Sequence, residues 1–179
     1  MAATVKVWDP LVRVFHWGLV AGITVAWISA DEWDRVHETT GYVVAGLIAF
    51  RLIWGVFGTH YARFTQFAAR PSAVLSYLRD ILGGREQRYI GHNPAGAAMI
   101  LALLLCLSGT ALTGWFQTID MFRGSDVMEE IHEVLANGML VLVALHIAGI
   151  IFASRSHSEN LVRAMITGRK RRPAGDDVK

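Results

Sequence analysis

The stretch HEVLANGMLVLVALH, residues 132–146, decides the interpretation of this chain, because it carries a histidine at each end of an almost wholly apolar segment. His132 and His146 are 14 residues apart. At about 100° per residue, fourteen helical steps fall about 40° short of four full turns, so both imidazoles point to the same side of a helix. At about 1.5 Å per residue they are separated by roughly 21 Å along the axis, which is most of the apolar thickness of a bilayer.

The composition indicates a membrane protein. The chain has 179 residues, 53% hydrophobic content and six Trp, which is too apolar for an ordinary soluble domain of this size. We expect one domain over residues 1–172 and a disordered tail over residues 173–179. A single cysteine, Cys106, excludes an intrachain disulfide and a C-x-x-C-H site for covalent haem. Asp9, Pro10 and Arg13 precede the first apolar run, so the start does not have the layout of a cleavable signal and the first span should stay in place.

Four long apolar segments predict an all-α membrane protein built as a bundle of four transmembrane helices. Each segment is near the length that crosses the hydrocarbon as a helix, and none shows the two-residue alternation of a barrel strand. The segments are residues 11–29, 40–57, 95–116 and 131–153.

Basic residues collect on one side of the predicted membrane. They occur at the start of the chain, in the long loop between spans two and three, and in GRKRRP near the end, whereas the other two loops are acidic. By the positive-inside rule, both termini and the long loop are cytoplasmic. Within that loop, apolar residues recur at helical spacing after Pro71, which predicts a short helix on the inner membrane face. These residues are Val74, Leu75, Leu78, Ile81 and Leu82. The alternative is a solvated linker with incidental aliphatic residues.

The histidines inside the spans fall at two matched depths. His16 and His146 both lie near the inner ends of their spans, and His37 and His132 both lie near the outer ends. Two imidazoles from facing helices are what an iron in a porphyrin plane takes from its two sides, so this arrangement predicts two bis-histidine haem sites. Zinc fits worse, because neither level offers a third or fourth ligand. A packing role for a single buried histidine is common, but four at two depths favour ligation.

Other residues of interest admit two interpretations. Arg51 is 14 residues after His37 and lies on the same helix face, at the level of the inner haem; it would pair with a haem propionate or snorkel to the inner surface. The glycines within the spans would make room for haem or pack helices closely. We expect His60, His92 and His157 to be loop residues, with His92 the one most suited to a further role. The glycines are Gly18, Gly22, Gly41, Gly46, Gly109, Gly114 and Gly138.

Four stretches resemble the bacterial cytochrome b561 family, which includes the b-type subunits of nickel-iron hydrogenases. They are VWDPLVRVFHW, HETTGYVVAGLIAFRLIWG, GHNPAGAAMILALLL and HEVLANGMLVLVALH, and the similarity covers nearly the whole chain. The resemblance implies two non-covalent b haems held by four histidines, an Arg at position 51, and a place in the bacterial inner membrane. The matching ligand positions are His16, His37, His132 and His146. We expect no fifth span of the kind associated with hydrogenase subunits, and this departure weakens the hydrogenase assignment.

The resemblance also implies electron transfer between the membrane quinone pool and a partner on the outer side, such as a c-type cytochrome or a dehydrogenase subunit. Membrane lipid is an expected partner and nucleic acid is not. Superoxide:quinone oxidoreductase activity is one alternative, although the acidic outer loops oppose the steering of an anion. A haem-bearing anchor for a hydrogenase or another dehydrogenase is a second alternative. The outer acidic residues are Asp31, Glu32, Asp34, Asp120 and Asp126.

Overall fold

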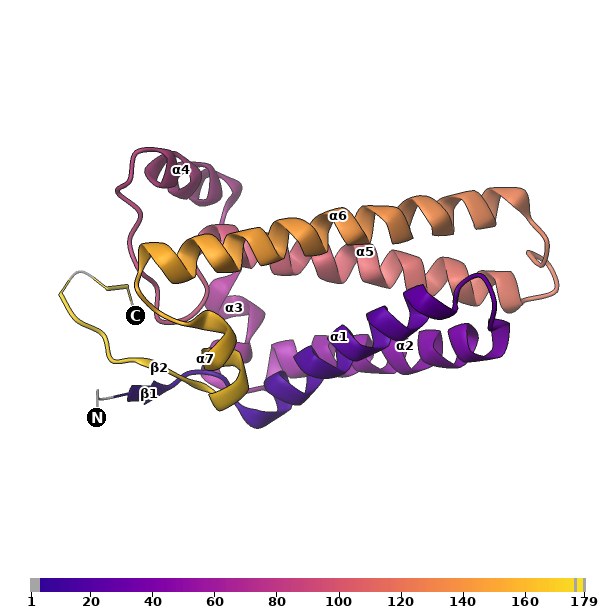
Figure 1. Cartoon of the computed structure of the whole chain (residues 1–179), viewed down its shortest axis with the longest axis horizontal. Helices are drawn as coiled ribbons and strands as arrows, with labels where there is room; N and C mark the ends of the chain where they lie inside the picture. Colours follow the sequence, from indigo (N-terminus) through magenta and orange to yellow (C-terminus); the bar gives the residue numbers. More distant parts are fainter. Residues whose placement is uncertain (1–3, 176, 179) are drawn as a thin grey trace. The chain divides into compact units, whose positions relative to one another are not determined.

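The protein is a multi-pass helical membrane protein. The computed structural model describes residues 4–175, 177 and 178. Four of its helices are long and apolar enough to cross a membrane, which confirms the four predicted spans. They are α1 (Pro10–Ser29), α2 (Asp34–Phe57), α5 (Pro94–Thr118) and α6 (Asp126–Ser156) (Figure 1).

The helices extend beyond the apolar segments that predicted them. Helix α2 begins at Asp34 instead of residue 40, and α6 begins at Asp126 instead of residue 131. Acidic side chains in these first turns suit the positive end of the helix dipole, so the polar flanks stay helical. As a result, His37, which precedes the predicted span 40–57, lies within a helical turn and not in a loop.

Shorter elements connect and flank the spans. A helix at Pro71–Leu82 (α4) confirms the predicted loop helix, whereas its position at the membrane surface stays a prediction. The two short strands and α7 were not anticipated, because each contains too few residues for a periodic pattern. The remaining elements are β1 (Thr4–Lys6), η1 (His60–Ala62), α3 (Phe64–Phe67), α7 (Leu161–Thr167) and β2 (Arg169–Arg171).

The chain falls into two compact units, and each is described by itself. The terminal unit contains Met1–Arg13, Ile53–Leu101 and Ala144–Lys179. The middle unit contains Val14–Leu52 and Ala102–Val143. A single domain over residues 1–172 stays a prediction.

The core of the middle unit joins all four long helices. Val44 and Ile48 of α2, Leu107 of α5 and Met139 of α6 are buried together, and Leu19 of α1 packs against them. Glycines permit this close approach. A Cβ on Gly22 would lie 2.8 Å from Val44, one on Gly18 would lie 3.3 Å from Leu47, and one on Gly109 would lie 3.1 Å from Leu135. For these three glycines, helix packing is therefore the interpretation that the structure supports.

Asp9 joins the beginning of α1 to the end of α2 within the terminal unit. Its carboxylate caps α1 by accepting a hydrogen bond from the backbone N–H of Val12 at 3.0 Å. The other carboxylate oxygen accepts from the Thr59 hydroxyl at 2.6 Å and from the Trp54 indole N–H at 3.3 Å. Burial opposes ionisation of Asp9, but these hydrogen bonds hold its pKa below the ordinary value.

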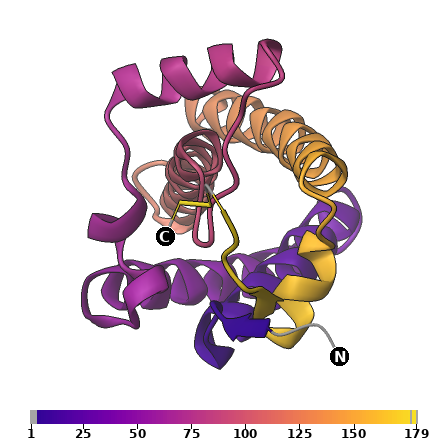
Figure 2. The same cartoon turned by 90° about the vertical axis from the view of Figure 1, so that its left-hand side faces the viewer.

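The N-terminal and C-terminal segments pair in the terminal unit. Strands β1 and β2 are antiparallel, with Val5 opposite Lys170, and Figure 2 shows α7 beside them. The core here is formed by Val7, Trp8, Ile90 and Ala164.

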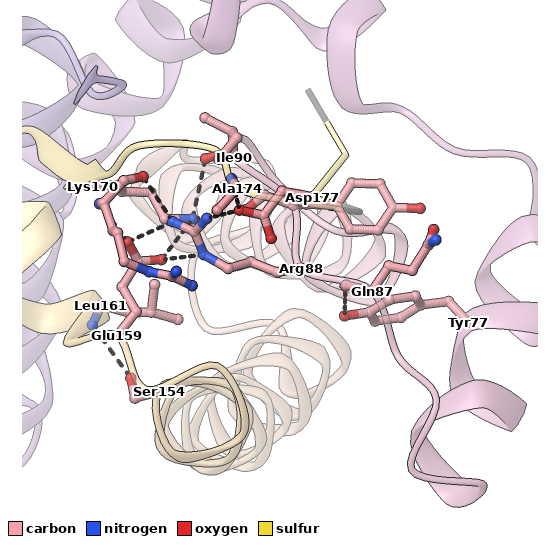
Figure 3. Close-up of polar contacts among 12 residues, drawn as sticks. Tyr77, Gln87, Arg88, Ile90, Ser154, Glu159, Leu161, Lys170, Ala174 and Asp177 are labelled. Carbon is pink, nitrogen blue, oxygen red and sulfur yellow. Dashed lines mark hydrogen bonds and ion pairs between the residues drawn. The ribbon is translucent and has the colours of Figure 1, made fainter. Parts of the chain in front are cut away.

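A buried ion cluster holds the segment that follows β2 (Figure 3). Arg88 donates to both carboxylate oxygens of Glu159, at 2.8 and 3.2 Å, and forms a short ion pair with Asp177. The backbone N–H of Val178 also donates to the Arg88 carbonyl at 2.8 Å. Asp177 and Val178, which fall within the tail predicted to be disordered over residues 173–179, therefore contact Arg88, and the disorder of that tail stays a prediction. The polar composition of the tail does not indicate these contacts, because Arg88 lies almost 90 residues earlier in the chain.

We predict that Asp9→Ala lowers the free energy of unfolding by about 2 kcal/mol, because it removes a helix cap and two further hydrogen bonds. Since the folded-state pKa of Asp9 is depressed below its unfolded value, its stabilising effect is present at neutral pH and is lost as the pH falls through the folded-state pKa. Thermal unfolding of the detergent-purified protein, followed by circular dichroism, measures both effects. The matched control is Asp31→Ala in an exposed loop. Equal unfolding temperatures for the two variants would contradict the role of Asp9.

Candidate haem-binding sites

Two of the four predicted ligand histidines lie side by side in the middle unit. His37 is in the first turn of α2 and His132 is in the second turn of α6. Their ring centroids are 6.1 Å apart and the ring planes are inclined at 76°. The sequence paired these residues by depth alone, and the structure brings the two rings together.

Each ring is oriented by a hydrogen bond at Nδ1. Nδ1–H of His37 donates to the Ala26 carbonyl of α1 at 2.8 Å. Nδ1 of His132 lies 3.0 Å from the Thr113 hydroxyl of α5. Because that hydroxyl gives its proton to the carbonyls of Gly109 and Thr110, it accepts from Nδ1–H of His132. Both histidines are thus assigned the tautomer that keeps a lone pair on Nε2.

This arrangement fits a metal held between two imidazoles. A bond between a metal and an imidazole nitrogen is about 2 Å long, so two imidazoles on opposite sides of one metal have ring centroids about 6 Å apart. The observed 6.1 Å agrees with that spacing. A ligating histidine also normally donates its second N–H to a carbonyl or another acceptor, as both rings do here. Within residues 4–175, 177 and 178, no group of three or more His, Cys, Asp or Glu side chains is placed to hold a metal ion.

Glycines next to the pair leave room beside the rings. A Cβ on Gly114 would lie 3.0 Å from the His132 ring, so a side chain at this position would crowd the ring. A Cβ on Gly41, one helical turn after His37, would meet nothing within 4 Å, and the same is true of Gly46 and Gly138. The open space beside Gly41 suits a flat group next to His37, which a larger side chain would obstruct.

Two other predicted site residues, His16 and Arg51, also lie in the middle unit. His16 is half-buried in α1 and its ring meets Trp17 edge-on, with centroids 5.1 Å apart. Arg51 of α2 is only 4% exposed. That burial favours a guanidinium held inside the protein over one that snorkels to the surface, and a buried guanidinium requires an anionic or carbonyl partner.

The fourth predicted ligand, His146, belongs to the terminal unit. It is half-buried in α6 and lies fourteen residues after His132 on the same continuous helix. His16 belongs to the other unit, so the pairing of His16 with His146 stays a prediction.

The three remaining histidines occupy segments outside the long helices, as expected. His60 is exposed in η1. The His92 ring packs between Trp8 and Phe67, with both centroid distances 4.6 Å, and lines a cavity of about 270 Å³. Burial lowers the pKa of His157, against the opposing effect of the Glu86 carboxylate.

Sequence reasoning missed the groups that orient the histidine pair. The carbonyl of Ala26 has no side-chain signature, and a threonine such as Thr113 is unremarkable within an apolar helix. The sequence contains one usable signal, because Thr113, which contacts His132, is followed directly by Gly114, where an added Cβ would lie 3.0 Å from the same ring. A Thr-Gly step at the depth of a ligand histidine on a neighbouring span could have indicated them.

Comparison with known proteins places the chain in a family. The family model described as prokaryotic cytochrome b561 matches residues 7–168. A probable Ni/Fe-hydrogenase B-type cytochrome subunit of Cupriavidus necator is 29% identical over 139 residues. That match covers 61% of this chain and 56% of the relative, so the chain spans little more than half the length of that protein. No solved structure matches the chain. Because the family model spans most of its length, this protein belongs to the prokaryotic cytochrome b561 family and is a membrane cytochrome that binds b-type haem.

Proposed function

We propose that this cytochrome carries electrons across the bacterial inner membrane through two non-covalent, bis-histidine b haems. The family supports haem-based transmembrane electron transfer. The observation that carries the proposal is the His37–His132 pair, whose 6.1 Å centroid separation suits one iron between two imidazoles. A b haem held by two histidines would supply one-electron exchange and not oxygen binding.

The outer haem would be held by His37 and His132. The Nδ1–H group of each ring donates a hydrogen bond to an oxygen atom. This bond fixes the ring orientation and makes Nε2 a stronger electron donor. The chain thereby sets the potential at this site through ligand basicity and burial.

The inner haem would be held by His16 and His146. The support is the spacing in the sequence: His146 follows His132 by fourteen residues on one face of α6, about 21 Å further along its axis. Arg51 follows His37 by the same interval on α2, and its buried guanidinium would pair with a propionate of the inner haem.

The electron partners are the quinone pool and a periplasmic protein such as a c-type cytochrome or a dehydrogenase subunit. The loops that flank the His37–His132 end are acidic, which suits a basic partner protein. The matched relative is a probable hydrogenase cytochrome subunit, which supports a second candidate function as the haem-bearing anchor of a hydrogenase or another dehydrogenase. Superoxide:quinone oxidoreductase activity has less support, because acidic loops repel an anionic substrate.

The orientation follows from charge. Basic residues are concentrated in both terminal segments and in the loop that contains α4. These segments would therefore be cytoplasmic. Helix α4 would lie on that membrane face, because Leu75, Leu78 and Leu82 are exposed along one side of it.

We predict that His132→Ala removes one b haem per chain and leaves the other, because only His37 and His132 serve the outer level. Reduced-minus-oxidised absorption spectra and extracted haem per chain measure the loss. His37→Ala should give the same result, and His60→Ala, which changes an exposed histidine outside the long helices, is the matched control. Loss of both haems from a variant that keeps its helical content would refute the assignment of ligands by depth.

We also predict that Thr113→Val raises the midpoint potential of the outer haem by tens of millivolts. A tenfold change in the equilibrium between oxidised and reduced haem corresponds to about 59 mV for one electron. Without its acceptor, the His132 imidazole donates less electron density and stabilises the ferric state less. Potentiometric titration of the purified protein measures the shift. Thr110→Val is the control, because the Thr110 hydroxyl donates to Cys106 on its own helix. An unchanged potential in Thr113→Val would exclude a tuning role for this hydrogen bond.

A further inference from the structure

The terminal unit contains a surface groove where α6 ends and the chain turns into α7. Its volume is about 410 Å³. The chain reverses at Ser158, whose backbone is in the left-handed region at φ 49°. Ile150, Ile151, Ser154, Arg155, Ser158, Glu159, Asn160 and Val162 line the groove.

The lining is divided into an apolar part and a polar part. The apolar part consists of Ile150 and Ile151 from the apolar stretch of α6, together with Val162 from α7. Ile151 and Val162 are exposed. Arg155, Ser158 and Asn160 lie at and beyond the last turn of α6, where a transmembrane helix leaves the hydrocarbon. Apolar and polar groups therefore meet in one groove at the level where phospholipid head groups lie.

The one carboxylate in the lining is neutralised by the ion cluster. Both oxygens of Glu159 receive hydrogen bonds from Arg88, and Lys170 Nζ lies 3.6 Å away (Figure 3). Although burial opposes ionisation of Glu159, these cationic partners hold its pKa below the ordinary value. The carboxylate therefore does not oppose an anion in the groove as an unpaired charge would.

The cation in the lining has no such partner. Among the residues that the structure describes, no carboxylate pairs with Arg155, which is exposed. Asn160 accepts from the Arg163 backbone N–H through its Oδ1 at 2.7 Å, so its amide N–H₂ remains a donor. The polar part of the groove thus offers a positive charge and an amide donor.

We propose that this groove binds one anionic phospholipid, with its phosphate on Arg155 and its acyl chains along Ile150, Ile151 and Val162. A soluble anion would use the polar part alone, and the apolar part of the groove selects a ligand with acyl chains. Arginine is the side chain best suited to hold a phosphate at a membrane surface. This inference is independent of the number of haems.

Native mass spectrometry of the full-length, haem-loaded protein in detergent tests the proposal, with phosphatidylglycerol and phosphatidylcholine as probes. The wild-type protein should bind one phosphatidylglycerol more tightly than phosphatidylcholine. Arg155→Gln should weaken phosphatidylglycerol binding about fivefold, the effect of one arginine at a charged surface. Arg79→Gln, which removes an exposed arginine of α4, should leave that binding unchanged.

A second variant tests the apolar part of the groove. Val162→Gln should weaken the binding of both lipids, because it removes apolar contact and leaves Arg155 in place. An unchanged haem spectrum shows that each variant is folded. Equal phosphatidylglycerol binding by Arg155→Gln and wild type would overturn the proposal, as would equal affinities for the two lipids or displacement of phosphatidylglycerol by millimolar inorganic phosphate.

Discussion

The structure depends most on how two imidazoles are accommodated between helices that are otherwise apolar. An uncompensated polar ring inside a membrane span is costly, so each ring must have a partner for both of its nitrogens. His37 and His132 meet this requirement at Nδ1 through the Ala26 carbonyl and the Thr113 hydroxyl. The remaining nitrogen of each ring is Nε2. The ring centroids are 6.1 Å apart, which suits one metal between the two rings. The four helices of the middle unit therefore meet at the His37–His132 pair: α2 and α6 carry the rings, and α1 and α5 carry the acceptors.

The glycines of the long helices fall into two groups: some pack closely against a neighbouring helix, and others face open space. Gly18, Gly22 and Gly109 are covered by aliphatic side chains of the neighbouring helix, and these contacts set the helix separations. Gly41 and Gly46 on α2 face open space instead. The same residue type thus serves two purposes in one bundle. In the terminal unit, Asp9 and the Arg88 cluster use buried, hydrogen-bonded charge to hold chain segments together. Breaking such a pair on one side only would leave a buried charge uncompensated.

The sequence predicted the long helices and the proximity of His37 and His132, because hydropathy and helical periodicity act over many residues. It underestimated the lengths of α2 and α6, since their polar first turns carry no apolar signal. It did not anticipate the β1–β2 pair or the contacts of Asp177 and Val178, which depend on partners far away along the chain. It could not distinguish the glycines, because only the facing side chain shows whether Gly22 packs a helix or Gly41 leaves a space.

The count of b haems in the purified protein tests the central claim most directly. The detergent-solubilised full chain would be examined by reduced-minus-oxidised absorption, and its haem would be extracted and divided by the protein concentration. If both proposed histidine pairs hold iron, the purified protein should contain two non-covalent b haems per chain. One haem per chain would contradict the second site at His16 and His146, and no haem, under expression conditions that supply it, would contradict the whole account.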